Sequence, residues 1–386
     1  MKRSILYILL ILLVGAAWLP AELGVNVRYD SYYSDNIFFN AGSVSDYVSG
    51  LSLSLDYNEK NVSLFTDISA SLFRENSDFN SFKIEPGIEF LKYLKGRNFI
   101  YASAGFSVLA YRELFTDFNY TGPFAELGLK YYLGTSFLLK GQYSFEQRNY
   151  SNYSSFDFLN HTFSIELNKF FKSSTTLRIR TGINYRYYPH IASLVEDSSD
   201  GAILFQGPGG GNGPGPQEPD PVQEPANITL KVPNVFATLR VAQGFGPNFG
   251  LVGEVELRKN FQGLEDAGAL IESSYVVYPY NDDYLWDGRR FSFHLNAIPF
   301  GELVLNMALS FYNKDYPGIY IMDEDGYVTE PLEERNDKMV QASFKVSKRF
   351  KKFSLYLIYI TRNNQSNDYY FDYRMWTLSM GIGYAL

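Results

Sequence analysis

Hydrophobic and polar residues alternate along most of this chain. Residues 175–188, TTLRIRTGINYRYY, show the pattern clearly. Alternate residues from Leu177 onwards are apolar or aromatic apart from one threonine, whereas the residues between them include Arg178, Arg180 and Arg186. Side chains of a β-strand point alternately to opposite faces, so this stretch predicts a strand with one apolar face and one basic face.

Comparable segments recur about every twenty residues. Sixteen are counted, at residues 22–33, 46–57, 61–73, 82–93, 99–111, 123–133, 136–148, 160–170, 175–188, 233–243, 249–260, 289–300, 302–313, 339–348, 353–362 and 375–386. Each offers about 9–11 alternating residues, enough to cross a bilayer at a tilt of about 45°. Aromatic residues gather near the segment ends, as they do at the interfaces of a membrane.

The connections between segments alternate between short and long. Seven are short and eight are long, as sixteen strands require when both ends of the chain lie on the side of the short turns. Outer-membrane barrels have short periplasmic turns and long extracellular loops. We therefore predict an all-β fold, a single antiparallel transmembrane β-barrel of about sixteen strands, with roughly 14 to 18 compatible with the pattern.

The longest connection, residues 190–227, contains GPGGGNGPGPQEPDPVQEP. Glycine and proline at this density do not form a packed element. We expect an external loop, the alternative being a segment that folds into the pore.

Composition narrows the class further. The 386 residues are 17% aromatic, contain no cysteine and have a formal net charge of -8. The missing cysteine excludes disulfides and thiolate sites, and the acidic balance argues against nucleic acid as a partner. Residues 1–21 join two basic residues to a short apolar run and small residues, which is the layout of a secretory signal peptide. The expected organisation is therefore a signal peptide at 1–21 and one barrel at 22–386. A soluble β-sandwich also buries one face of each strand, but it does not account for the leader and the alternation of connection lengths.

The last segment carries an apolar face that resembles the C-terminal strand of bacterial outer-membrane β-barrels. Its residues for assembly would be Trp376, Ile382, Tyr384 and Leu386, although Phe or Trp is usual where this chain has Leu386. Residues 28–38, RYDSYYSDNIF, resemble the start of porin-like barrels such as the β-barrel porin 2 group. The resemblance implies the outer membrane of a diderm bacterium, with the barrel-assembly machinery, outer-membrane lipid and lipopolysaccharide as partners.

A membrane barrel turns its apolar face to lipid and its polar face to the lumen. An arginine that faced lipid at mid-bilayer would cost about 2–4 kcal/mol, so we predict that the arginines point inward. Counting alternate positions then gives two walls. The predicted basic wall comprises Lys140, Arg148, Arg178, Arg180, Arg186 and Arg240. The predicted acidic wall comprises Asp56, Asp67, Glu85 and Glu89.

These two walls lie about seven strands apart, nearly opposite in a ring of sixteen, and would set up a field across the lumen. The alternative is that the charges pair with their strand neighbours and only hold a hydrated wall. Glu254 and Glu256, for example, lie close enough along the chain to pair with Arg240.

Catalytic signals are weak, because the three histidines form no defensible set with a serine and an acid. We expect no enzymatic activity, no metal and no cofactor. The leading hypothesis is a porin-type channel for passive diffusion of small hydrophilic solutes. The alternatives are a barrel for export or passage of an anionic polysaccharide and a non-conducting adhesion or structural barrel. A homotrimer is expected by fold-level analogy alone.

Overall fold

The computed structural model describes residues 23–152, 154–192, 227–261, 286–321, 329 and 331–385. The expected signal peptide, most of the loop 190–227 and the terminal Leu386 lie outside these residues. Within them the chain forms sixteen strands. They are β1 Leu23–Ser34, β2 Asp46–Glu59, β3 Val62–Phe73, β4 Ser81–Tyr93, β5 Phe99–Tyr111, β6 Tyr120–Leu133, β7 Phe137–Tyr150, β8 Phe158–Phe170, β9 Thr175–Ala192, β10 Asn227–Phe245, β11 Phe249–Asn260, β12 Asp287–Ala297, β13 Leu303–Tyr320, β14 Glu334–Phe350, β15 Phe353–Ser366 and β16 Tyr373–Ala385.

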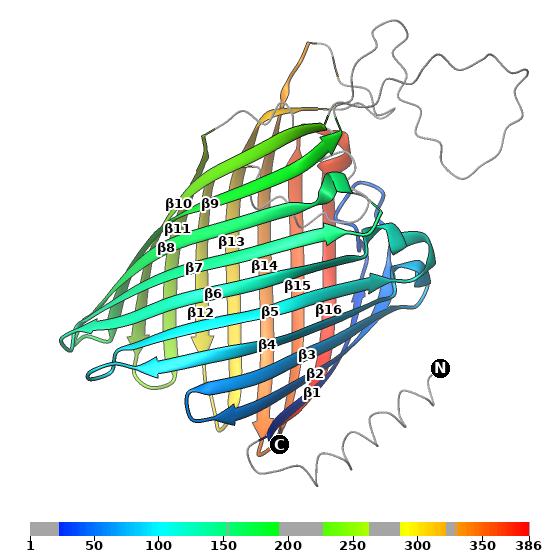
Figure 1. Cartoon of the computed structure of the whole chain (residues 1–386). Helices are drawn as coiled ribbons and strands as arrows, with labels where there is room; N and C mark the ends of the chain where they lie inside the picture. Colours follow the sequence, from blue (N-terminus) through cyan, green and yellow to red (C-terminus); the bar gives the residue numbers. More distant parts are fainter. Residues whose placement is uncertain are drawn as a thin grey trace, which may run out of the picture.

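The strands form one closed barrel in which each strand pairs with its neighbours in sequence (Figure 1). The ring closes where β1 meets β16 antiparallel, with Asn26 opposite Ala385 and Ser34 opposite Thr377. Closure leaves no unpaired strand edge, so every strand finds hydrogen-bond partners on both sides. The prediction of a sixteen-stranded antiparallel barrel is confirmed. No helix among the described residues is long and apolar enough to cross a membrane.

The two ends of the barrel differ as the sequence predicts. At one end, short turns join β2 to β3, β4 to β5 and every second pair of strands after them. The beginning of β1 and the end of β16 lie at the same end. Gly134, in the turn between β6 and β7, has φ +71°, a conformation that glycine adopts without a steric penalty. The described parts of the long connections lie at the other end, where short 3-10 helices such as η2 Glu113–Phe118 join successive strands. We call this end the loop end.

Several strands are longer than the segments predicted from the sequence. β9 continues to Ala192 instead of ending at 188, and β10 begins at Asn227 instead of 233. The strands predicted at 302–313 and 339–348 are also longer, because β13 continues to Tyr320 and β14 begins at Glu334, with Lys314 opposite Asp337. The alternation of apolar residues ends earlier than the ladder, because past the apolar band the outward residues of β13 are no longer apolar, whereas the ladder continues and Tyr316 and Ile319 pack inward. The predicted strand 289–300 ends instead at Ala297, just before Pro299, which has no N–H to give to a ladder.

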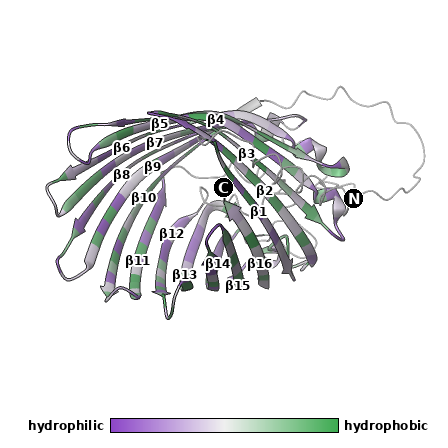
Figure 2. Ribbon diagram, turned by 90° about the horizontal axis from the view of Figure 1, so that it is seen from below, coloured by the Kyte–Doolittle hydropathy of each residue, from purple (hydrophilic) through white to green (hydrophobic). Residues whose placement is uncertain are grey.

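The barrel has an apolar outer face and a polar inner face. On β2 the outward residues Leu51, Leu53 and Leu55 are bracketed by Tyr47 and Tyr57, which gives the apolar band with aromatic borders that a bilayer favours. Figure 2 shows the strands around the barrel axis, with hydrophobic and hydrophilic residues alternating along them.

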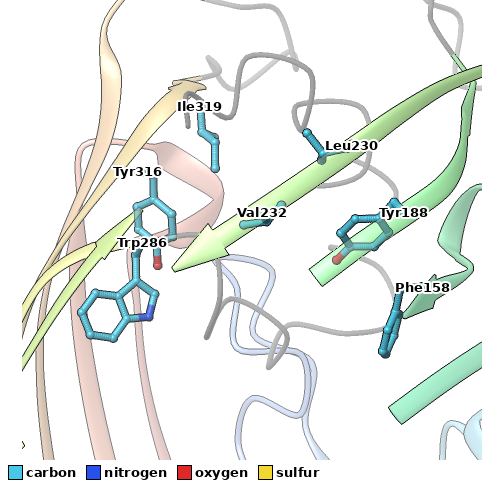
Figure 3. Close-up of a cluster of buried hydrophobic side chains, with 7 residues drawn as sticks. All are labelled: Phe158, Tyr188, Leu230, Val232, Trp286, Tyr316 and Ile319. Carbon is cyan, nitrogen blue, oxygen red and sulfur yellow. The ribbon is translucent and has the colours of Figure 1, made fainter. Parts of the chain in front are cut away.

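One hydrophobic cluster lies on the inner face near the loop end. It joins β8, β9, β10 and β13 with the residue that precedes β12 (Figure 3). Its members are Phe158, Tyr188, Leu230, Val232, Trp286, Tyr316 and Ile319. Buried apolar packing therefore stabilises the inner wall at this end, and cationic side chains such as Arg186 and Arg258 lie over its rings.

Candidate functional site: the inner wall of the barrel

Contacts that skip a strand identify the inner face. Arg178 on β9 donates from Nη2 to Oε2 of Glu254 on β11 at 2.8 Å, across the intervening β10. Arg28 on β1 donates from Nε to the hydroxyl of Tyr356 on β15 at 3.0 Å, across β16. Side chains converge in this way only on the concave side of a curved sheet. The polar set of alternate residues therefore lines the lumen.

All six residues of the predicted basic wall lie on this inner set of positions, on β7, β9 and β10. Arg178 and Arg240 stand directly opposite each other on β9 and β10. Both lie near Glu254, whose Oε2 is 2.8 Å from Nη2 of Arg178 and 3.9 Å from Nη1 of Arg240. Glu166 serves a second pair, at 2.7 Å from Nζ of Lys140 and 3.7 Å from Nη1 of Arg178.

The remaining basic residues have different partners. Arg148 pairs with Glu146 on its own strand at 2.7 Å. Arg180 donates to the hydroxyl of Ser164 at 3.3 Å. The guanidinium of Arg186 lies 4.2 Å from the centre of the Phe158 ring, which joins the basic wall to the hydrophobic cluster.

The ion-pair network extends to β12 through a residue that the sequence analysis did not single out. Arg290 donates from Nη2 to Glu254 at 2.8 Å and lies 2.7 Å from Glu256. Counting alternate positions along β12 puts Arg290 on the same inner face as His294, so the sequence did contain the signal. Glu254 thus lies among three arginines while its side chain is only 10% exposed.

Pairing does not cancel the basic wall. Inner positions of β7 to β12 hold eight basic residues, Lys140, Arg148, Arg178, Arg180, Arg186, Arg240, Arg258 and Arg290, against four acidic ones, Glu146, Glu166, Glu254 and Glu256. The arginines therefore pair with carboxylates, as one alternative from the sequence expects, and a basic excess remains among the inner residues of these strands. Paired guanidiniums are held in place, so their positive charge has a defined position on the wall.

The four residues of the predicted acidic wall also lie at inner positions. Asp67 on β3 stands opposite Glu85 on β4, and Asp56 on β2 stands opposite Phe65 on β3. Lys83 pairs with Glu85 at 2.8 Å. Lys83 offsets the charge of Glu85, but Asp56, Asp67 and Glu89 form no ion pair among the described residues, so this wall favours positive charge in the lumen.

Glu126 on β6 extends the acidic wall and was not predicted. It accepts a hydrogen bond from the hydroxyl of Tyr101 on β5. Strands β5 and β6 also bring aromatic rings to the inner face. The alternation of residues alone did not suggest that these rings belong to a site.

Of the residues proposed for assembly, Trp376, Ile382 and Tyr384 lie on the outer face of β16, and Leu386 is outside the described residues. Trp376 and Ile382 are 38% and 42% exposed, and the Tyr384 ring lies 4.7 Å from that of Phe353. His161 is also on the outer face, where its Nδ1 lies 2.8 Å from the Tyr143 hydroxyl. Within the part of the chain that the structure describes, no group of three His, Cys, Asp or Glu residues could hold a metal ion.

No family model matches the chain, and no curated protein matches it. The resemblance to the β-barrel porin 2 group therefore stays a prediction. Among solved structures the chain is similar to CdiB from Acinetobacter baumannii, with a TM-score of 0.51 and 10% identity over 95% of this chain and 60% of that one. It is also similar to the outer membrane protein OpdK from Pseudomonas aeruginosa, at 0.49 and 9% over 95% and 100% of the two chains. OccAB1 from Acinetobacter baumannii gives 0.49 and 9% over 94% and 96%. At these identities the likeness is one of fold, and that fold is the closed β-barrel found in outer-membrane proteins.

Proposed function

We propose that the chain is an outer-membrane porin-type channel through which small hydrophilic solutes diffuse passively. The closed ladder satisfies the backbone hydrogen bonds without water, as a hydrocarbon layer demands. The outer face supplies an apolar band with aromatic borders. In this orientation the short turns face the periplasm and the loop end faces the exterior.

The charged inner wall is the observation that carries the proposal. Arginines and carboxylates line the inner face of β7 to β12 behind apolar outer residues, as Arg178 does between Leu177 and Ile179, where lipid would surround a barrel in the membrane. A barrel of sixteen strands is too wide for side chains to fill, so its lumen holds water. That water hydrates the charges and gives a polar solute a continuous path.

Two walls of opposite sign define the selectivity of this channel. The basic excess on β7 to β12 attracts anions, and the carboxylates on β2 to β6 attract cations. A solute that carries both charges is oriented across the lumen. Export through the signal peptide, insertion by the barrel-assembly machinery, contact with lipopolysaccharide and assembly as a homotrimer belong to the same proposal, and cross-linking in detergent tests the last of these.

Single-channel recording tests the proposal. The mature chain is refolded and inserted into a planar bilayer with a salt gradient across it, and the reversal potential is measured. We expect a steady open conductance. Arg180→Gln combined with Arg240→Gln should then shift the reversal potential towards cations, because both arginines are on the inner wall and neither is among the most tightly paired.

Arg289→Gln is the matched control. Arg289 belongs to the same part of the wall as Arg290, but it occupies the outer set of positions and is exposed. Its loss should leave the reversal potential unchanged. A silent bilayer with insertion verified would contradict the channel and favour a non-conducting adhesion barrel, whereas current that opens only with an anionic polysaccharide would favour an exporter.

A further inference from the structure

Aromatic rings cover glycines at several points of the inner wall. A Cβ atom added to any of these glycines would meet the ring of a residue on the neighbouring strand. The five pairs are Gly87 with Phe65, Gly105 with Phe124, Gly128 with Tyr101, Gly182 with Phe236 and Gly381 with Tyr356. Because glycine has no side chain, the ring lies against the backbone, and Phe65 and Phe124 remain partly exposed on the inner face.

Two of these rings hold cations of the protein itself. The guanidinium of Arg180 lies 5.3 Å from the centre of the Phe236 ring. Arg28 and Lys345 lie 4.9 Å and 5.5 Å from the centre of the Tyr356 ring. These distances are those of cation–π contacts, in which the negative face of the ring attracts the charge.

Phe65 and Phe124 differ from those two rings. They lean from β3 and β6 over Gly87 and Gly105, which stand opposite each other on β4 and β5. The ring centres are 6.4 Å apart and the planes are inclined by 37°. Among the residues that the structure describes, no arginine or lysine stacks on either ring. We call this pair of rings the Phe65–Phe124 platform.

Carboxylates surround the platform on the inner face. Asp56 stands opposite Phe65 in the ladder, and Asp67 follows two residues after Phe65, about 7 Å along the strand. Glu85 and Glu89 lie on either side of Gly87 at the same spacing. Glu126 lies two residues after Phe124 and bonds to Tyr101. Of these five carboxylates, Glu85 is the one that forms an ion pair with a lysine within the described residues.

We infer that the Phe65–Phe124 platform binds an organic cation, an ammonium or guanidinium group attached to a small apolar or aromatic body, on its way through the lumen. This inference rests on the proposed channel and names a solute class for its acidic wall. The apolar body packs on the rings, and the cation reaches the ring faces and the carboxylates together. At Phe236 and Tyr356 the protein satisfies the same kind of ring with its own arginines and lysine, which shows what charge the geometry accepts.

An anion is repelled by this wall, and a neutral sugar gains the ring contact without the charge attraction. The expected order of binding is therefore an aromatic cation first, its neutral analogue second and its anionic analogue last. That order separates the inference from general filtering by size, because the three probes have nearly the same volume.

Block of single-channel current measures this order. The probes are 2-phenylethylammonium, 2-phenylethanol and phenylacetate, applied to the refolded full barrel. We expect the ammonium to block at about tenfold lower concentration than the alcohol, the ratio that one or two cation–π contacts supply. Equal block by all three probes would overturn the inference.

Two sets of variants locate the site. Phe65→Leu with Phe124→Leu keeps apolar volume over the glycines and removes the ring faces, so block by the ammonium should weaken about tenfold. Phe236→Leu is the matched control. It removes a ring that also covers a glycine, but this ring is on the opposite wall and already contacts Arg180. Block by the ammonium should therefore be unchanged. Asp67→Asn with Glu89→Gln should reduce the preference for the ammonium over the alcohol while keeping the rings.

The outcomes distinguish the two proposals. Normal conductance with the same ammonium block in the wild type and the Phe65/Phe124 variant refutes the platform and leaves the channel standing. A silent but folded barrel refutes the channel. Binding of the ammonium is then measured directly by NMR on the detergent-solubilised barrel. Loss of binding in the variants would still support the platform. If the double leucine variant does not fold, the carboxylate variants decide on their own, since an unchanged preference there contradicts the inference.

Discussion

Glu254→Gln is the substitution for which the structure makes the sharpest stability prediction. Glu254 receives hydrogen bonds at 2.8 Å from both Arg178 and Arg290, and Arg240 lies 3.9 Å away. A glutamine keeps one oxygen acceptor, so one of the two charge-assisted bonds is lost, a contribution of about 1.5–3 kcal/mol. The three guanidiniums then repel one another with less counter-charge, since Glu256 still lies beside Arg290 and Glu166 beside Arg178. Water in the lumen also screens them, because the arginines are 26% to 37% exposed. We expect a loss of about 2 kcal/mol in the free energy of unfolding.

Urea unfolding of the refolded barrel in lipid, followed by tryptophan fluorescence, gives this quantity. Glu89→Gln is the control, because Glu89 is also an inner carboxylate and forms no ion pair within the described residues; its loss should cost less than about 0.5 kcal/mol. Glu254→Gln combined with Arg290→Gln should cost less than the sum of the two single changes, since both substitutions remove the same ion pair. Equal unfolding midpoints for Glu254→Gln and Glu89→Gln would refute the reasoning.

Two further predictions concern packing and the loop end. Gly182→Ala should destabilise the barrel by about 1–3 kcal/mol, because a Cβ atom at residue 182 would lie 2.5 Å from a backbone oxygen and 2.6 Å from the Phe236 ring. Gly253→Ala is the control. A Cβ atom at residue 253 has no atom within 4 Å, so this substitution should be neutral in the same urea assay. Asp46, beyond the apolar band, accepts backbone hydrogen bonds from residues 74–76, including one of 2.9 Å from the N–H of Asn76. Burial by itself raises the pKa of the Asp46 carboxyl, but the hydrogen bonds from Asn76 and its neighbours outweigh burial and hold that pKa below its usual value. Because the folded pKa is lowered, the hydrogen bonds to the Asp46 carboxylate are present above the unfolded pKa of about 4 and are lost as the pH falls further. The protection factors for hydrogen exchange at residues 74–76, which correct for the slower intrinsic exchange in acid, should therefore fall below that pH in the wild type. In Asp46→Ala they should already be low at neutral pH.

The strand pattern and its faces were predictable from local sequence. The alternation in residues 175–188 is enough to put Arg178, Arg180 and Arg186 on one face of a strand, because side-chain direction in a strand depends only on parity. The alternation of connection lengths then orders the strands without any knowledge of their contacts. Arg290 could have been found in the same way, whereas the continuation of β13 to Tyr320 could not, because past the apolar band no hydrophobic period marks the ladder.

The sequence by itself therefore determined that this chain forms a β-barrel with an apolar outer face and a charged inner face. Only the tertiary structure decided which charges meet, since the contact between Arg178 and Glu254 spans two strand pairings and depends on the register of both. It also decided that Phe65 and Phe124, separated by three strand connections, lie 6.4 Å apart over two glycines. Parity is a property of each strand alone, but register and closure are properties of the whole ring, and the chemistry of the lumen arises where side chains of different strands converge.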